Sequence, residues 1–230
     1  MYALFGAYAT SVRAVELFGS IGVQGLSRAE LEVVARSSQR RRQDFAAGRA
    51  CAHAATSAWG FDSQSLLPDD HGVPQWPGGI SGSITHTHGY ALAATLWQLT
   101  VICDSHNYAL GVGRLASVGV DAEHIDSVGA DVYDMIFTAL ERDSLARLHG
   151  PERQWAATAM FVAKEAFYKA QYPLTVEWIG FEEANVTVES SRLRLAWSET
   201  PSSRLIGPGP WLGGLARRGD AAVAAFVLSQ

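Results

Sequence analysis

Both lysines of this 230-residue chain lie within one short segment, Phe161–Tyr172, which reads FVAKEAFYKAQY. Its apolar residues recur at helical spacing, so we expect an amphipathic helix from about Glu152 to Gln171, ended by Pro173 and packed on a core. Glu165 and Lys169 stand four residues apart, which places them on one face of that helix. This geometry suits a functional site, although a solvated surface ion pair has the same spacing.

Composition limits the classes of protein to which this chain can belong. Apolar residues make up 48% of it, enough for a real core, while the net charge of −5 argues against a nucleic-acid binder with a broad basic surface. Two cysteines without a zinc-type spacing favour a reducing, cytoplasmic compartment. The uncharged stretch 71–103 contains prolines, glycines and histidines, so we do not expect a membrane helix.

One local segment reverses the acidic balance of the chain. Residues 33–61 contain five arginines and one aspartate, a local net charge of +4. We expect a helix over Arg41–Trp59 that ends at Gly60. Phosphate groups suit such a segment, with Arg49 the better candidate because Gly48 beside it permits close approach of the backbone. A solvated basic helix face is the alternative.

The remaining elements follow from capping, alternation and turn signals. Capping boxes begin helices at Ser27 and Thr138, and a further helical segment is expected near residues 131–137. Strands are expected at Ala3–Ala9, Tyr90–Leu96, Trp97–Cys103, Val118–Glu123, Asn185–Val188, Leu193–Trp197 and Ala221–Leu228, with Val12–Phe18 of uncertain type. The glycine- and proline-rich segment Gly207–Gly214 is expected to be a mobile loop or a plain connector.

A histidine- and hydroxyl-rich segment follows the basic helix. His86 and His88 are expected on one face of a strand. As a zinc pair they lack a third ligand nearby, whereas Thr85 and His86 together can donate to phosphate oxygens. A hydrogen-bonded strand histidine is the alternative for each.

Two acids stand close together on the strand expected at Val118–Glu123. Asp121 and Glu123 leave the same face of that strand, with α-carbons roughly 6 to 7 Å apart. Two carboxylates at this spacing can bind one hard cation such as Mg²⁺, although isolated acid pairs on strands are usually only solvated.

These segments together resemble a known family. Gly119–Glu123 (GVDAE), followed by Lys164–Ala170 (KEAFYKA), is similar to the paired signature of 4′-phosphopantetheinyl transferases. Upstream segments resemble the larger, monomeric branch that serves siderophore, non-ribosomal peptide and polyketide assembly: Phe45–Arg49, Gly72–Pro74 with Trp76–Pro77, and Gly82–His86. The resemblance runs from about Arg40 to Phe181.

The resemblance implies a reaction and an assignment of roles. It implies transfer of phosphopantetheine from coenzyme A to a serine of an apo acyl or peptidyl carrier protein, releasing adenosine 3′,5′-bisphosphate. Asp121, Glu123 and Glu165 would bind Mg²⁺, or Mn²⁺ in its place, with Glu165 also the first choice of base. Lys169 would stabilise phosphate charge as the bond breaks.

Further residues are assigned to coenzyme A by the same resemblance: Arg49, Thr85 and His86, with Arg42 and Lys164 as weaker additions. The family commonly places Lys or Arg before Gly72, whereas this chain has His71, a candidate with a weaker or pH-dependent phosphate contact.

The implied fold is α+β, with two similar halves, each a small antiparallel sheet packed with helices, and an active site at their interface. We expect an N-terminal half over residues 1–117 that binds the coenzyme phosphates, and a C-terminal half over 118–230 that carries the metal ligands and catalytic residues. A monomer is expected. Two other functions remain open: a coenzyme A or carrier-protein binding module without catalysis, and a metal-dependent pyrophosphate hydrolase.

Overall fold

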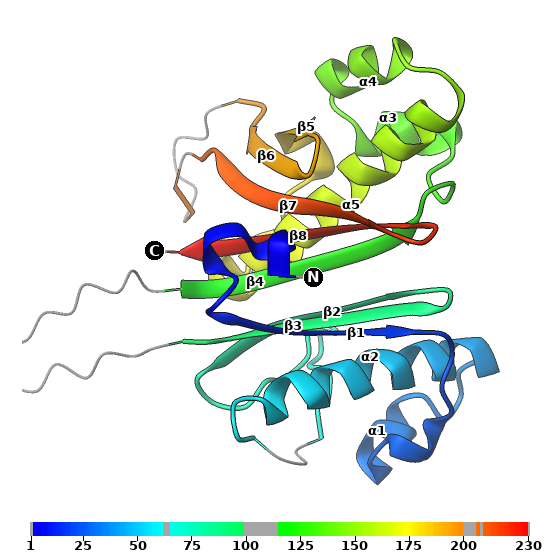
Figure 1. The fold of residues 1–230 in the computed structure, drawn as a ribbon, viewed down its shortest axis with the longest axis vertical. Helices are drawn as coiled ribbons and strands as arrows, with labels where there is room; N and C mark the ends of the chain where they lie inside the picture. Colours follow the sequence, from blue (N-terminus) through cyan, green and yellow to red (C-terminus); the bar gives the residue numbers. More distant parts are fainter. Residues whose placement is uncertain (1, 62–64, 99–114, 200–205, 208, 230) are drawn as a thin grey trace, which may run out of the picture.

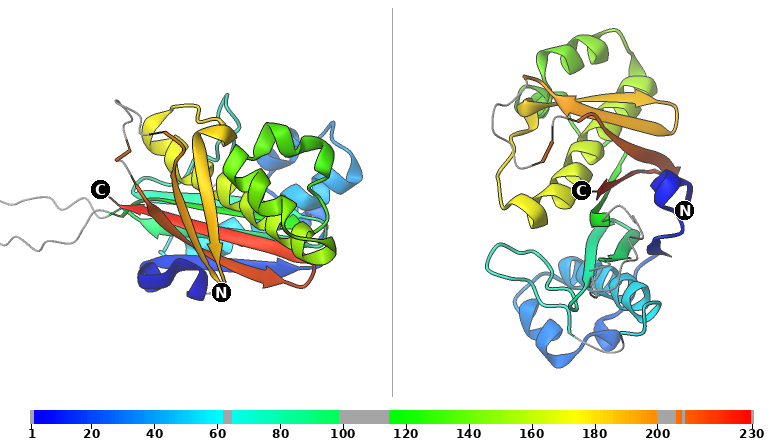
Figure 2. Two further views of the ribbon diagram at one scale, coloured as in Figure 1. Left: turned by 90° about the horizontal axis from the view of Figure 1, so that it is seen from above. Right: turned by 90° about the vertical axis from the view of Figure 1, so that its left-hand side faces the viewer.

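Two antiparallel sheets, each covered by helices, form the α+β fold expected from the sequence (Figure 1). The computed structural model describes residues 2–61, 65–98, 115–199, 206–207 and 209–229. The smaller sheet has the strand order β1-β3-β2 and the larger has β4-β8-β7-β6-β5. The two sheets lie against each other, with helices on the outer side of each (Figure 2).

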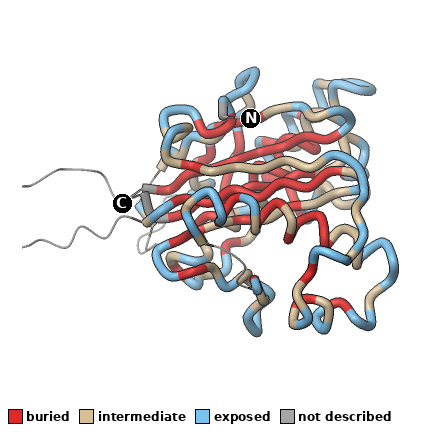
Figure 3. Tube along the Cα trace, turned by 60° about the horizontal axis from the view of Figure 1, so that its bottom comes forward, coloured by how far each residue is buried: buried red, intermediate tan, exposed pale blue. Residues whose placement is uncertain are grey.

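The smaller sheet is formed by the first part of the chain. Its strands are β1 (Val12–Phe18), β2 (Ile80–Thr87) and, between them, β3 (Tyr90–Trp97). Helix α1 (Arg28–Val33) begins at the expected Ser27 capping box, and α2 (Gln39–Ser57) packs across the sheet. Strand β3 is almost wholly buried because α2 covers one of its faces and the larger sheet covers the other. Buried residues run along the central segments of the molecule, and exposed residues lie mostly in the connections at its periphery (Figure 3).

The larger sheet and its helices follow in the chain. The strands are β4 (Leu115–His124), β5 (Ala184–Glu189), β6 (Arg192–Trp197), β7 (Trp211–Arg218) and β8 (Ala221–Ser229). The helices are α3 (Tyr133–Ile136), α4 (Ala139–Ala146), which begins at the expected Thr138 capping box, and the long α5 (Gly150–Thr175). Short 3₁₀ segments complete the fold: η1 (Tyr2–Tyr8), η2 (Val23–Gly25), η3 (Ala130–Val132) and η4 (Phe181–Glu183).

Helix α5 lies directly on β4 because of one glycine. A Cβ added at Gly119 would lie 1.9 Å from the carbonyl oxygen of Ala166 and 2.5 Å from the amide nitrogen of Ala170. Only glycine lets the helix backbone approach the strand this closely. This contact sets the distance between the acids of β4 and the charged face of α5.

A row of hydroxyl side chains joins β2 to β4. Strand β4 is the edge of the larger sheet, so its backbone groups on the side away from β8 have no strand partner. The hydroxyl row consists of alternate residues of β2, which share one face: Ser81, Ser83, Thr85 and Thr87. The Ser83 hydroxyl accepts from the Val120 N–H at 3.1 Å, and the Thr85 hydroxyl accepts from the Ala122 N–H at 3.1 Å. Side chains of β2 therefore take the place of a neighbouring strand.

Three expectations about elements are wrong. The segment Ala3–Ala9 belongs mainly to the 3₁₀ segment η1, which buries Leu4 and Phe5 against β7 and β8; a short apolar run does not distinguish strand from helix. Gly207–Gly214 is not all loop: its last residues begin β7, where a Cβ at Gly214 would meet the Leu4 backbone. Helix α5 continues past Pro173 to Thr175, since a proline in the last turn removes only one helical hydrogen bond.

Other expectations have mixed outcomes. Val12–Phe18 is a strand, and the hairpin of β5 and β6 forms as expected. His88 lies in the turn after β2, so it does not share a strand face with His86. The strand expected over Trp97–Cys103 lies, beyond Gln98, outside the described residues. The division at residue 117 stays a prediction; β4 runs through this position as one strand. In the described part of the chain, no helix is both long and apolar enough to cross a membrane.

Candidate active site

The acids of β4 and the charged face of α5 meet at a cavity of about 300 Å³ between the two sheets. We call it the acid cavity. It is lined by Ile84, Thr85, His86, Asp121, Glu123, Phe161, Glu165 and Lys169. Six of the ten sequence-predicted site residues thus lie around one space, although they come from three elements far apart in the chain.

Asp121 is the most constrained of the acids, with only 5% of the residue exposed. The Lys169 ammonium donates to Oδ1 of Asp121 at 2.6 Å, and the Thr85 hydroxyl donates to the same oxygen at 3.1 Å. A hydroxyl has one proton to donate, and in this structure Thr85 gives it to Asp121. The structure therefore supports a role for Thr85 in orienting Asp121 rather than the expected phosphate contact.

The other two acids are shifted toward the neutral form. Burial, followed by the nearby negative charge of Asp121, raises the pKa of Glu123 above its usual range. The same two causes raise the pKa of Glu165, against the opposing effect of Lys169. Three carboxylates in one partly buried cavity repel one another, which favours a bound cation.

The donor set suits a hard cation, but it is not preassembled. Carboxylate oxygens are the protein ligands that Mg²⁺ prefers. Among the residues that the structure describes, however, no three or more His, Cys, Asp or Glu side chains are grouped closely enough to hold a metal ion. The Lys169 ammonium supplies the positive charge beside Asp121 instead.

A second cavity, of about 530 Å³, continues from the acid cavity. We call it the basic groove; it shares Ile84, His86, Glu165 and Lys169 with the acid cavity. Arg49 lines it from α2, is 6% exposed, and has a buried Nε without a hydrogen-bond partner. Burial lowers the pKa of Arg49 to about 10. A buried guanidinium with an unpaired N–H is suited to bind an anion.

His86 contacts a groove residue that the sequence analysis did not select as a site residue. Arg41 Nη1 lies 3.1 Å from His86 Nε2, and because a guanidinium only donates, the ring nitrogen accepts. Burial, and next the charge of Arg41, lower the pKa of His86. The signal for Arg41 was present in the sequence: it precedes Phe45, Gly48 and Arg49 by four, seven and eight residues, so all four share one helix face.

Aromatic residues form another part of the basic groove that sequence reasoning missed. Tyr168 and Tyr172 of α5 both line it, and their rings lie 5.4 Å apart between centroids. His71 also lines it and lies edge-on to Tyr172 at 6.4 Å. The loop that carries His71 is ordered by Asp69, whose Oδ1 accepts from the N–H groups of His71 and Val73. The i, i+4 spacing of the tyrosines was the available signal.

Two expected coenzyme ligands lie elsewhere. Arg42 is half-buried and lines neither cavity. Lys164 is buried beside α3, α4 and η4, where Nζ donates to the Ile136 carbonyl at 2.9 Å, to Glu141 Oε2 at 2.6 Å and to the Phe181 carbonyl at 2.6 Å. All three N–H groups of the ammonium have protein acceptors, so this position does not support a phosphate contact.

Comparisons with known proteins show the family to which the chain belongs. The family model of the 4′-phosphopantetheinyl transferase N-terminal domain matches residues 29–96, and that of the 4′-phosphopantetheinyl transferase superfamily matches residues 117–207. The 4′-phosphopantetheinyl transferase PptT of Mycobacterium tuberculosis is 36% identical over 188 residues, which are 80% of this chain and 74% of that protein. The chain belongs to the 4′-phosphopantetheinyl transferase superfamily.

Two further relatives in the superfamily are 35% identical to this chain. They are the 4′-phosphopantetheinyl transferase Npt of Nocardia iowensis and the 4′-phosphopantetheinyl transferase Svp of Streptomyces mobaraensis. The matches cover 70% and 79% of this chain, but only 65% and 66% of those proteins, so the chain spans about two thirds of their length. A holo-[acyl-carrier-protein] synthase (AcpS) structure from Thermotoga maritima matches 50% of this chain and 64% of its own, with 19% identity and a TM-score of 0.38, too low to carry an argument.

Proposed function

We propose that this protein transfers the 4′-phosphopantetheine group of coenzyme A to a serine of an apo acyl or peptidyl carrier protein. The observation that carries the proposal is the junction of the two cavities. There, Glu165 and Lys169 face both the acid cavity and a basic groove that contains a buried arginine with an unpaired N–H. We further propose a cytoplasmic monomer that serves siderophore, polyketide or non-ribosomal peptide assembly.

The basic groove suits coenzyme A in size and in charge. Its volume of about 530 Å³ lies within the usual range of about 300–1,000 Å³ for small-molecule sites. Arg49 and Arg41 would bind phosphate oxygens, and the His71 ring would add a hydrogen-bond contact. With Nε2 of His86 accepting from Arg41, the ring would carry its proton on Nδ1. Tyr168 and Tyr172 offer an apolar face to the organic part of the molecule.

The oxygen donors Asp121, Glu123 and Glu165 suit a divalent cation, Mg²⁺ or Mn²⁺, in chemistry, and they would have to draw together to bind it. When bound, it would neutralise pyrophosphate charge and stabilise the leaving phosphate. The raised pKa values of Glu123 and Glu165 support this assignment, because a cation would relieve the repulsion that causes part of the shift.

The protein's own groups would perform the proton transfer and the charge stabilisation. Glu165 would accept the proton of the serine hydroxyl, because its carboxylate lines both the acid cavity and the basic groove. The Lys169 ammonium donates one of its three N–H groups to Asp121 and would direct the others at the pyrophosphate as charge develops on the leaving oxygen.

A third cavity suggests how the acceptor enters. This acceptor groove, of about 370 Å³, shares Glu123 and Phe161 with the acid cavity and is otherwise mainly apolar. Its other lining residues are Ser127, Val128, Val132, Met135, Ile136 and Phe181. With coenzyme A in the basic groove, the carrier segment that bears the serine would reach Glu165 from this side.

Intact-mass spectrometry of an apo carrier protein, incubated with this protein, coenzyme A and Mg²⁺, tests the proposal. We expect a gain of one phosphopantetheine on the carrier serine that is absent when EDTA is added. Cleavage of coenzyme A without modification of the carrier would instead indicate the pyrophosphate hydrolase. Intact coenzyme A and an unmodified carrier, together with measurable coenzyme binding, would indicate the binding module.

A further inference from the structure

The buried ammonium of Lys164 connects three segments that are separate in the chain. Its acceptors belong to the last residue of α3, to α4 and to η4: the Ile136 carbonyl, the Glu141 carboxylate and the Phe181 carbonyl. The side chain is 2% exposed, so water does not compete for these hydrogen bonds. Charge-assisted hydrogen bonds at 2.6 to 2.9 Å to three segments hold them in one arrangement.

Two of these acceptors belong to residues that line the acceptor groove. Ile136 and Phe181 both line the groove, and the carbonyl oxygens of both accept from Lys164. A change in the length of either hydrogen bond therefore moves a lining segment. The shape of the groove depends on an ammonium that lies behind it.

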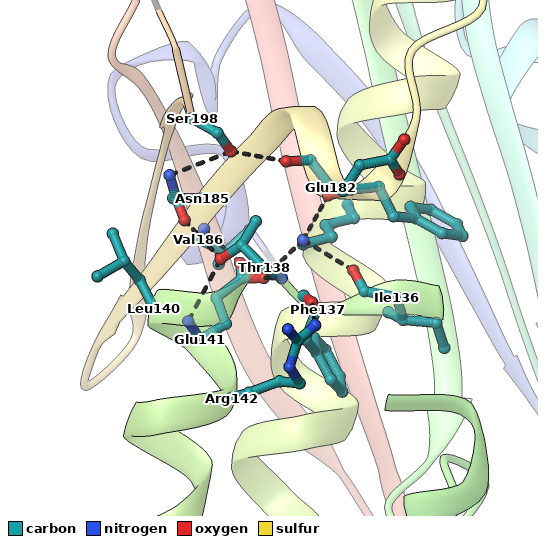
Figure 4. Close-up of polar contacts among 12 residues, drawn as sticks. Ile136, Phe137, Thr138, Leu140, Glu141, Arg142, Glu182, Asn185, Val186 and Ser198 are labelled. Carbon is teal, nitrogen blue, oxygen red and sulfur yellow. Dashed lines mark hydrogen bonds and ion pairs between the residues drawn. The ribbon is translucent and has the colours of Figure 1, made fainter. Parts of the chain in front are cut away.

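The third acceptor, Glu141, is itself fixed. Its Oε2 accepts from the Thr138 N–H at 2.8 Å, and its Oε1 accepts from the Val186 N–H of β5 at 2.7 Å (Figure 4). The same carboxylate thus closes the capping box of α4 and joins that helix to the sheet. Lys164 is anchored to a rigid point, and the two groove segments are anchored to Lys164.

Glu165, which follows Lys164 in α5, points to the acid cavity. We propose that Lys164 is a positioning residue. It fixes the position of the acceptor groove relative to the turn of α5 that carries Glu165, the proposed base. This inference rests on the proposed function. It commits the groove to one occupant, the serine-bearing segment of the apo carrier protein.

Two observations support that occupant. The acceptor groove is continuous with the acid cavity through Glu123 and Phe161, so a segment seated in it presents a side chain to the carboxylates. Met135, at the groove, is 66% exposed, and a flexible thioether in such a place suits contact with apolar side chains beside the serine.

The test is steady-state kinetics of the double variant Lys164→Met with Glu141→Gln. This change removes both charges together, so neither is left buried without a partner. We expect the KM for the carrier protein to rise about tenfold, the scale of one well-packed interface contact, with the KM for coenzyme A unchanged. Hydrogen exchange should accelerate at residues 133–137 and 180–183.

Gln171→Leu is the matched control. Gln171 is another fully buried polar residue of α5, and its amide donates to the Glu177 carbonyl at 3.0 Å, away from the acceptor groove. Its loss should lower stability without changing the carrier KM or the exchange of residues 133–137. If the double variant does not fold, Lys164→Arg, which keeps the buried charge opposite Glu141 but changes the geometry of its N–H donors, carries the same measurements.

The outcomes separate this inference from the proposed function. Wild-type protein that transfers nothing to any carrier refutes the function itself. Wild-type protein that transfers, with a folded variant whose carrier KM is unchanged, refutes only the role of Lys164. A fall in kcat with both KM values unchanged means that Lys164 is merely structural, which also overturns the inference.

Discussion

The contact between Gly119 and α5 gives the sharpest prediction, the effect of Gly119→Ala. The new Cβ would lie 1.9 Å from the Ala166 carbonyl oxygen, whereas real Cβ contacts are essentially never shorter than 3.0 Å. The helix must therefore retreat by about 1.1 Å, the difference between these two values. The 2.6 Å contact between Lys169 and Asp121 would then lengthen toward about 3.7 Å, beyond a hydrogen bond.

This displacement should affect stability and catalysis to different degrees. Overpacking a well-packed contact costs about 1–3 kcal/mol of unfolding free energy. A shift of about 1 Å in catalytic groups costs roughly 10²-fold in rate. We therefore expect urea unfolding to show the modest loss, and intact-mass assays of carrier modification at saturating substrates to show the larger one.

Gly25→Ala is the control for this experiment. No atom lies within 4 Å of the added Cβ, and the backbone at Gly25 does not require glycine. The control should match the wild type in both assays. Gly119→Ala with near-normal turnover would show that the distance between α5 and β4 does not set the site, and the reasoning would be refuted.

Three further predictions follow from the site. Glu165→Gln should lower the transfer rate by about 10² to 10⁴ while leaving coenzyme binding intact, and near-normal single-turnover rates would remove its role as base. Arg49→Met should weaken coenzyme A binding about 10- to 100-fold, the scale of one charged hydrogen bond, as measured by calorimetry. It should not destabilise the apo protein in thermal unfolding, because it removes a buried and partly unpaired charge. Burial and the charges of Arg41 and Lys169, opposed by Asp44, lower the pKa of His86 in the folded protein. Below the ordinary histidine pKa of 6.5, the unfolded chain therefore binds a proton that the folded chain does not. Wild-type stability should fall as pH drops below 6.5, by up to about 1.4 kcal/mol per pH unit from this group, and an equal fall in His86→Gln would contradict the assignment.

Local patterns in the sequence predicted much of the fold. The capping boxes at Ser27 and Thr138 predicted helix starts correctly, because the reciprocal hydrogen bonds that define them involve only four consecutive residues. The first strand was wrong because η1 owes its conformation to β7 and β8, which follow it by some two hundred residues. Contacts at that separation leave no trace in local periodicity.

The roles of the site residues stay predictions, but the structure shows what local patterns miss. Alternation along β4 paired Asp121 with Glu123, and helical spacing along α5 paired Glu165 with Lys169, but neither pattern predicted the contact between Asp121 and Lys169. Neither pattern reveals which hydrogen bonds a side chain has already made. Thr85 was expected to face phosphate but gives its proton to Asp121, and Lys164 was expected at the coenzyme but is consumed by three internal acceptors.

The hydroxyl row of β2 makes each half of the chain dependent on the other. Severed from β2, the C-terminal half would present the edge of β4 with unpaired N–H and C=O groups, a template on which another chain could add a strand. Apolar surfaces can shift relative to one another, but the Ser83 and Thr85 hydroxyls accept from the Val120 and Ala122 N–H groups in only one register of β2 against β4. In chimaeras made from this protein and a relative, β2 and β4 should therefore come from the same parent, because their contacts depend on both strands.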